Sequence, residues 1–145
     1  MMIRGAVHRD AKAIIGIIME MQGAHVSRRG TVTQVERMLN AARRRDDYVV
    51  RVAEKENRVR GFLSAMYMMR HGLWEDKFVW QVQFLMGMNV LKPLLEDLRH
   101  FAGKTPVLML VGWEDDPRAG SLDAALQRMG FSEFGSVLCS RGLVP

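Results

Sequence analysis

The amino-acid sequence predicts a single α/β domain that spans residues 1–145. Two observations lead to this prediction. Segments whose apolar residues recur at helical spacing, about four in all, alternate with about six to seven strand-like segments. The composition, with 48% apolar and 26% charged residues, is typical of a globular chain, and 145 residues are enough to bury a core. The chain contains no internal repeat, linker or low-complexity segment.

The first expected elements are a short strand and a helix. Residues 3–7 are mostly apolar, and Asp10 can cap a helix whose apolar face repeats at helical spacing through Gln22. Gly23 ends this helix, and residues 24–31 follow as a basic, glycine-containing loop.

A second helix is expected to begin near Thr33, because Thr33 and Glu36 have the spacing of a capping box. The helix ends in three arginines at 43–45, whose charges suit the negative end of a helix dipole. With Arg28 and Arg29 they contribute much of the net charge of +5. We interpret both clusters as solvated helix ends. The sequence argues against nucleic acid as a partner, because no strand alternates aromatic and basic residues.

The middle of the chain predicts a three-strand meander. Strands at 48–53 and 59–67 are joined across a polar turn centred on Asn57, which is the pattern of a hairpin. A third strand is expected at 78–86, after a loop at 70–76.

The stretch 77–112 is the centre of the predicted domain. The strand at 78–86 leads through a loop that contains Gly87 to a helix at 93–101 and a second apolar strand at 107–111. A helix whose first amide groups point back at a strand end is a common way to hold a phosphorylated or otherwise anionic ligand. We therefore regard this strand–loop–helix as the candidate binding segment.

The start of the helix at 93–101 carries acidic residues. Pro93 favours the first helical turn, which would place Glu96 and Asp97 within that turn. Carboxylates there stabilise the helix but occupy the positive end that an anionic ligand would need, and Lys92 offsets them only partly.

The last expected elements are a helix and a pair of short strands. The helix is marked by apolar residues at helical spacing and closed by Gly130, and the strands lie at 131–134 and 136–140. The apolar residues of this helix are Leu122, Ala125, Leu126 and Met129.

Several kinds of protein are disfavoured by the composition. A single cysteine, Cys139, agrees with a reducing compartment, and no apolar run approaches the roughly 18 residues of a membrane span. The first residues lack the apolar stretch of a signal peptide, so we expect a cytoplasmic protein. No metal site is expected, because no pair of the four histidines has ligand spacing on one helix face.

The order of the elements resembles the fold of the GCN5-related N-acetyltransferases, abbreviated GNAT. Three segments strengthen the resemblance. Residues 59–63, Val-Arg-Gly-Phe-Leu, look like the third strand of that family, and the strand–loop–helix at 78–101 follows in the expected place. Residues 126–131, Leu-Gln-Arg-Met-Gly-Phe, are similar to the closing helix of the family and the Gly-Phe pair that ends it. The resemblance covers nearly the whole chain. It implies a divergent member with a mixed, mostly antiparallel central sheet of six to seven strands and about four flanking helices.

The resemblance also implies acetyl-CoA as cofactor. Members of the family pair the fourth strand with the pantetheine arm and wrap the pyrophosphate in a basic, glycine-rich loop. The matching positions here have one glycine and one cation, so the binding loop is degenerate. The implied cofactor-binding residues are Phe84, Leu85, Met86, Gly87, Met88, Asn89, Val90 and Lys92.

The catalytic groups implied by the resemblance are few. Glu75 or Asp76, with His71 as a further candidate, would be the general base. The tyrosine that often protonates the departing thiolate in the family is matched by Leu126, which cannot do so.

Two functions follow from the resemblance. The first is a divergent acetyl-CoA-dependent N-acetyltransferase that acts on an unidentified amine by direct transfer. The alternative is a catalytically inactive GNAT-fold protein that binds a protein partner, or a phage virion or assembly protein, because degenerate GNAT-like proteins of this size occur in bacteriophages. If it is a phage protein, we expect it to be virion-associated. The sequence leaves open whether the chain forms a homo-oligomer, and we expect no association with a membrane.

Overall fold

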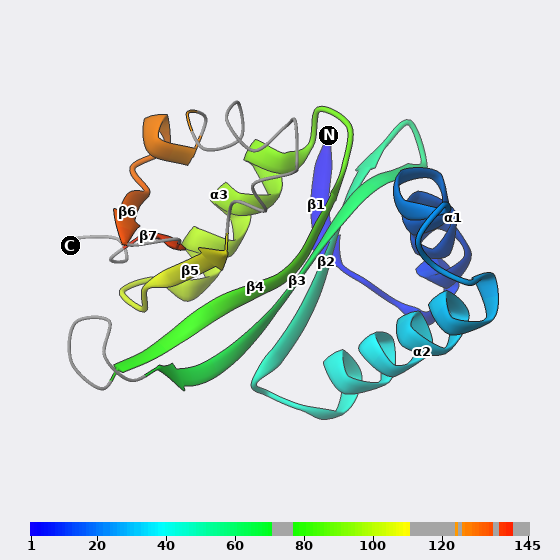
Figure 1. The fold of residues 1–145 in the computed structure, drawn as a ribbon, viewed down its shortest axis with the longest axis horizontal. Helices are drawn as coiled ribbons and strands as arrows, with labels where there is room; N and C mark the ends of the chain where they lie inside the picture. The colour runs from blue at the N-terminus through cyan, green and yellow to red at the C-terminus, as the bar shows by residue number, and fades with distance from the viewer. Residues whose placement is uncertain (71–76, 111–123, 125, 135–136, 141–145) are drawn as a thin grey trace. The chain divides into compact units, whose positions relative to one another are not determined.

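The computed structural model describes residues 1–70, 77–110, 124, 126–134 and 137–140 (Figure 1). The chain divides into two compact units. Unit 1 comprises Met1–Ala65 and Gln83–Asp97, and unit 2 comprises Met66–Val82 and Leu98–Pro145. The implied cofactor-binding residues from Phe84 to Lys92 therefore lie in unit 1.

The strands form one seven-stranded sheet in the order β1-β2-β3-β4-β5-β7-β6. Pairs β1–β2, β5–β7 and β6–β7 are antiparallel, and β4–β5 is parallel. The expectation of a mixed, mostly antiparallel sheet of six to seven strands is therefore confirmed. The strands are β1 (Met2–Gly5), β2 (Tyr48–Lys55), β3 (Arg58–Arg70), β4 (Lys77–Gly87), β5 (Val107–Leu110), β6 (Ser132–Phe134) and β7 (Val137–Ser140).

The hairpin between β2 and β3 turns in two residues. Glu56 and Asn57 have φ angles of 55° and 62°. Two successive positive φ angles are the geometry of a type I′ turn, whose twist matches that of the paired strands. The predicted hairpin is confirmed, with a tighter turn than the sequence indicated.

The helices are η1 (His8–Asp10), α1 (Ala11–Gln22), α2 (Arg28–Arg44) and α3 (Leu91–Ala102), and residues 124 and 126–128 are also helical. Helix α2 packs against α1 and β2 (Figure 1). Val35, Met38 and Leu39 are buried, as their helical spacing predicts, whereas Ala42, which shares that spacing, is half-buried and Thr31 is buried in addition. No helix in the described ranges is long and apolar enough to cross a membrane.

Helix α2 begins earlier than the sequence indicated. Ser27 is the N-cap, and its Oγ accepts a hydrogen bond of 3.0 Å from the Gly30 amide. The Thr33 hydroxyl instead donates to the carbonyl oxygen of Arg29 at 3.1 Å, which is how threonine bonds inside a helix. The capping box predicted at Thr33 and Glu36 is therefore wrong, and residues 28–31 belong to the helix, not to a loop.

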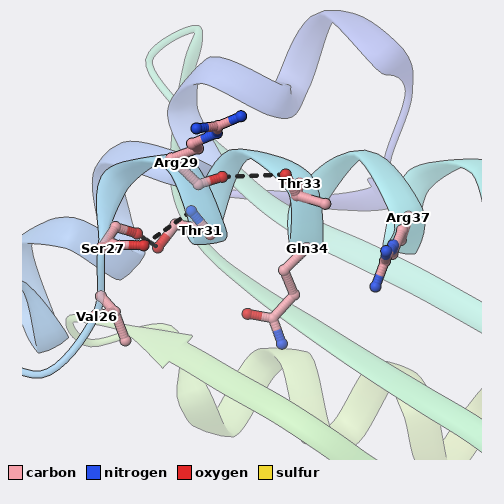
Figure 2. Close-up of a pocket in the computed structure, with 8 residues that line it drawn as sticks. Val26, Ser27, Arg29, Thr31, Thr33, Gln34 and Arg37 are labelled. Carbon is pink, nitrogen blue, oxygen red and sulfur yellow. Dashed lines mark hydrogen bonds between the residues drawn. The ribbon is translucent and has the colours of Figure 1, made fainter.

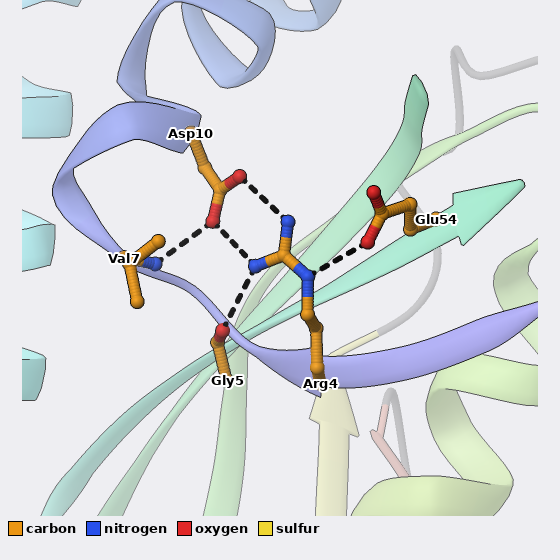
Figure 3. A network of polar contacts seen from close by, with 5 residues as sticks. All are labelled: Arg4, Gly5, Val7, Asp10 and Glu54. Carbon is orange, nitrogen blue, oxygen red and sulfur yellow. Dashed lines mark hydrogen bonds and ion pairs between the residues drawn. The ribbon is translucent and has the colours of Figure 1, made fainter. Parts of the chain in front are cut away.

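Asp10 does not cap α1 through its side chain. Its carboxylate accepts two hydrogen bonds from the Arg4 guanidinium, at 2.8 and 2.9 Å, and one of 2.8 Å from the Val7 amide (Figure 3). Arg4 also donates to Glu54 on β2 at 2.9 Å. The Arg4–Asp10–Glu54 network thus joins β1, β2 and the turn that precedes α1.

Burial and pairing both act on the ionisation of this network. Asp10 is only 4% exposed, and burial alone would raise the pKa of its carboxyl. The hydrogen bonds from Arg4 outweigh that effect and hold the pKa of Asp10 below its ordinary value. The same bonds raise the pKa of Arg4, so both groups are charged near neutral pH.

The described part of unit 2 is organised around aromatic contacts. Tyr67 stacks on Phe78 at 5.0 Å between ring centroids and also meets Trp80 at 5.3 Å. Trp80 meets Phe101 edge-on at 5.3 Å, and its amide donates to the Pro106 carbonyl oxygen at 2.9 Å. These contacts fix β4 against the start of β5, whose residues Val107 and Leu108 are fully buried, as expected for a strand covered on both faces.

Candidate functional site

The candidate site is the connection between β4 and α3 in unit 1. Strand β4 continues to Gly87 and α3 begins at Leu91, so only Met88, Asn89 and Val90 lie between them. Asn89 has a φ of 60°, a left-handed conformation that asparagine tolerates better than most residues. The chain therefore passes from strand to helix in a short, sharply bent loop.

Gly87 is required by a close contact with β3. Its φ is +136°, and a Cβ added to it would lie 2.6 Å from the Cα of Gly61 and 2.7 Å from the Arg60 carbonyl oxygen. A Cβ on Gly61 would in turn meet Val90 Cγ2 and the carbonyl oxygen of Met86. The two glycines thus let two backbones approach more closely than side chains allow. The only glycine among residues 84–92 is explained by the fold without any ligand.

Val90 anchors the loop on this glycine pair. It is 2% exposed, and its carbonyl oxygen accepts a hydrogen bond of 3.1 Å from the Leu94 amide. An added Cβ at Gly87 would meet Val90 Cγ2 at 2.6 Å. The start of α3 is therefore positioned by packing against β3 and β4, and the main chain of the loop is held in place before any ligand binds.

The acidic residues of α3 lie further into the helix than the sequence indicated. Because α3 begins at Leu91, its first turn contains Lys92 and Pro93 and no acidic residue. The Asp97 carboxylate accepts two hydrogen bonds from Arg51 on β2, at 2.8 and 3.1 Å. The prediction that Glu96 and Asp97 occupy the first turn is wrong, because Pro93 lies at the third helical position, where its missing amide hydrogen costs nothing.

Lys92 is the exposed cation at the helix start. Its side chain is 71% exposed, and Nζ lies 3.9 Å from Glu96 Oε1, one turn along α3. An exposed pair at that distance contributes little to stability, so Lys92 is available to an anionic ligand. Because Arg51 neutralises Asp97, Glu96 is the one carboxylate of α3 that opposes an anion near Lys92.

The predicted cofactor-binding residues divide into two groups. Met86 and Val90 are buried and, with Gly87, build the loop. Met88 is 76% exposed, and Asn89 and Lys92 are also exposed. Phe84 and Leu85 are half-buried at the end of β4. The first group sets the geometry, and the second offers the side chains that a ligand could meet.

The candidate catalytic residues His71, Glu75 and Asp76 lie outside the described residues. Within the described ranges, no group of three or more His, Cys, Asp and Glu side chains could hold a metal ion. Leu126, which the resemblance matched to a proton-donating tyrosine, is fully buried. The described part of the chain therefore supplies binding geometry for this site.

Two residues that build the site were not identified from the sequence. Gly61 pairs with Gly87, and Arg51 neutralises Asp97. A glycine inside a strand signals a close backbone approach, and that signal was present at Gly61 within the segment matched to the third strand. Arg51 lies in a strand 46 residues before its partner, and no local pattern connects the two.

Comparison with known proteins identifies the fold. No family model matches the sequence, and no curated protein matches it significantly. Among solved structures, the chain is similar to the aminoglycoside 6'-N-acetyltransferase from Enterococcus faecium, with 10% identity, 100% of this chain and 98% of that chain covered, and a TM-score of 0.69. It is also similar to the PaiA N-acetyltransferase from Thermoplasma acidophilum in complex with coenzyme A, with 13% identity, 95% of each chain covered and a TM-score of 0.62.

A third similar structure is AAC(6')-Iy in complex with a bisubstrate analogue, CoA-S-monomethyl-acetylneamine. It shares 14% identity over 99% of this chain and 95% of that chain, with a TM-score of 0.71. All three are acetyltransferases of the GNAT type. The chain therefore has the GNAT fold, as the order of its elements indicated.

Proposed function

We propose that the protein is a divergent acetyl-CoA-dependent N-acetyltransferase that acts on an amine by direct transfer. The observation that carries the proposal is the β4–α3 connection. It is a preformed strand–loop–helix with an exposed cation and no acidic residue in the first turn of α3, in a chain with the acetyltransferase fold. Two of the similar acetyltransferases are complexes with coenzyme A or with an analogue that contains it, which supports acetyl-CoA as the ligand class.

The residues of this connection fit the parts of such a cofactor. The backbone of Phe84 to Met86 would pair with an extended chain and polarise a carbonyl group. The Lys92 side chain and the amide groups at the start of α3 would face phosphates, while Pro93 contributes no amide hydrogen. Because Gly87 is packed against Gly61, its amide is not free to approach a phosphate as the amides of a glycine-rich loop do. We therefore expect weaker binding of the phosphates than such a loop provides.

Acetyl-CoA supplies the acetyl thioester, and transfer forms a C–N bond to the amine, breaks the C–S bond and releases the amine proton to a base or to water. We propose Glu75, Asp76 or His71 as that base. Leu126 is an apolar, fully buried side chain, so the proton that the thiolate takes up must come from water or another residue.

Calorimetric titration with acetyl-CoA tests this proposal. We expect dissociation constants on the order of micromolar to tens of micromolar for the natural sequence, since one cation and a few amides hold the phosphates. Lys92→Glu should weaken binding about tenfold or more, because it reverses the charge beside the pyrophosphate. Lys55→Glu, at an exposed lysine of β2, is the matched control and should bind normally. No measurable heat at millimolar acetyl-CoA would contradict the proposal.

The alternative is a catalytically inactive protein of this fold that binds a protein partner, including a role in a phage virion or its assembly. The observations that favour it are the structural use of Gly87 and the burial of Leu126. Under this alternative, acetyl-CoA would not bind, and affinity capture from the native host would recover a stable stoichiometric partner. Release of coenzyme A from acetyl-CoA on addition of an amine, with a rate that depends on Lys92, would exclude it.

A further inference from the structure

The positive charge of the chain is concentrated on one helix. Helix α2 contains five arginines and one glutamate, a formal charge of +4, whereas the whole chain has a formal charge of +5. The sequence presented its arginines as two separate clusters at loop and helix ends. The structure places Arg28 and Arg29 in the same helix of 17 residues as Arg43 and Arg44, and Arg45 follows as its C-cap.

Three of these arginines share one face of α2. At about 100° per residue, positions 29, 33, 37, 40 and 44 fall within an arc of about 80°. The residues at these positions, which we call the basic face, are all exposed: Arg29, Thr33, Arg37, Asn40 and Arg44. The buried residues Val35, Met38 and Leu39 point into the core of unit 1. The basic face is therefore presented to solvent along the length of the helix.

The arginines of the basic face make no ion pair among the described residues. Other arginines of unit 1 are paired with carboxylates: Arg4 with Asp10 at 2.8 Å, Arg45 with Asp47 at 2.7 Å and Arg51 with Asp97 at 2.8 Å. Glu36, the one carboxylate of α2, lies beside this face, about 20° from Arg29 around the helix axis. With Glu36 counted, the three arginines still give this side of α2 a formal charge of +2.

An open hollow of about 650 Å³ lies at the N-terminal half of the basic face (Figure 2). Arg29, Thr33 and Arg37 of the basic face line one side of it, and its other polar residues are Ser27, Thr31 and Gln34. Hydroxyl, amide and guanidinium groups are the side-chain groups that contact phosphate oxygens in protein–nucleic acid complexes. A shallow, open hollow of this kind suits an extended chain lying across the helix better than an enclosed small molecule.

We propose that the basic face of α2 binds the phosphate backbone of nucleic acid. Protein interfaces combine arginine with aromatic and apolar anchors at their centre, and the basic face has arginines but no aromatic or apolar residue, which favours a polyanion over a folded protein. The proposal departs from the interpretation of the arginines as separate solvated helix ends. Binding of nucleic acid at this face does not require that the protein transfers acetyl groups.

The spacing of the arginines fits a regular polyanion. With a rise of about 1.5 Å per residue, Arg29 and Arg37 are about 12 Å apart along the helix axis, and Arg37 and Arg44 about 10 Å. The three arginines together span about 22 Å, which is the length of six to seven base pairs along a duplex axis. Because each strand winds around the duplex, the phosphates within reach on one side come from both strands, and we expect up to three contacts. The recognition contains no base contact, so we expect no sequence preference.

Fluorescence anisotropy with a labelled 20-base-pair DNA duplex tests the proposal. The variant R29Q/R37Q/R44Q removes the three cations, and R9Q/K55Q/R58Q removes three exposed cations elsewhere in unit 1, so the two variants have the same net charge. Each lost phosphate contact should reduce the slope of log affinity against log salt by about 0.9, or about 2.7 for three. Between 50 and 200 mM salt, the natural sequence should thus lose about 40-fold more affinity than R29Q/R37Q/R44Q.

Three outcomes would overturn the proposal. The first is that the duplex fails to bind at 50 mM salt. The second is that both variants lose affinity equally, which would indicate an effect of net charge alone. The third is that polyglutamate binds and the duplex does not, which would indicate an acidic protein partner.

Far-ultraviolet circular dichroism and thermal unfolding of both variants verify the fold. All six substituted positions are exposed, so we expect both variants to fold normally. Acetyl-CoA titration of R29Q/R37Q/R44Q should match the natural sequence, which separates this proposal from the proposed function.

Discussion

The Arg4–Asp10–Glu54 network and the β4–α3 connection use charged residues in opposite ways. In the network, the Asp10 carboxylate accepts three hydrogen bonds and is nearly inaccessible to solvent. In the connection, Lys92 is 71% exposed and its nearest carboxylate oxygen is 3.9 Å away. The first region satisfies its charges in short, buried hydrogen bonds, and the second holds its cation only in a long, exposed ion pair. The difference indicates that the network holds the fold together, whereas the connection is available to a ligand.

Gly87 shows that one segment can contain residues that hold the fold together as well as residues that are open to a ligand. It lies in the candidate binding segment, yet its contacts with Gly61 and Val90 are structural. Lys92, five residues later, has no such constraint. Position in a binding loop therefore does not identify a binding residue, and the contacts of each residue decide its role.

The largest effect is expected for Gly87→Ala. The added Cβ would lie 2.6 Å from Gly61 Cα at a φ of +136°, which requires the two backbones to separate. We expect the free energy of unfolding to fall by about 3 kcal/mol or more. Urea unfolding measures it. Gly16→Ala on α1, where a Cβ meets nothing within 4 Å, is the control and should be neutral or stabilising by up to about 1 kcal/mol. A neutral Gly87→Ala would show that the glycine pair is not structural.

An intermediate effect is expected for Asp10→Asn. Removing the buried charge leaves Arg4 with weaker hydrogen bonds, and we expect a loss of about 2–3 kcal/mol in the free energy of unfolding. Because the folded pKa of Asp10 is lowered, its contribution is present above the unfolded pKa of about 3.9 and is lost as pH falls through the folded value. Unfolding measured from about pH 6 down to pH 2 should therefore show a weaker acid dependence in the variant.

The smallest effect is expected for Asp47→Asn, the control for Asp10→Asn. Asp47 also accepts two hydrogen bonds from one arginine, Arg45, at 2.7 Å each, but this pair lies at the surface. Solvent screens such a pair, so stability should hardly change. Equal losses at Asp10 and Asp47 would mean that burial does not distinguish the two pairs.

The sequence predicted the elements well because their signals are local. Helical spacing identified α1 and the buried face of α2, and the polar segment around Asn57 identified the β2–β3 turn. The start of α2 was misplaced because Ser27 and Thr33 are both plausible caps, and only the hydrogen bond from Gly30 to Ser27 distinguishes them.

The candidate site was predicted less completely because its determinants are distant in sequence. The sequence located the loop, but Gly61 and Arg51 act on it from other strands, 26 and 46 residues away from Gly87 and Asp97. The position of Glu96 and Asp97 was misjudged because Pro93 was assumed to begin the helix. A proline is tolerated anywhere in the first turn, so it defines a helix start only to within about one turn.

Amide hydrogen exchange with and without saturating acetyl-CoA tests the central claim most directly, because it locates the ligand as well as detecting it. We predict slower exchange at Phe84 to Met86 and at the first amides of α3, Leu91 and Lys92, while peptides from the Arg4–Asp10–Glu54 network are unchanged. Protection confined to other segments, or none at a concentration where binding is saturated, would contradict the assignment of the β4–α3 connection as the cofactor site.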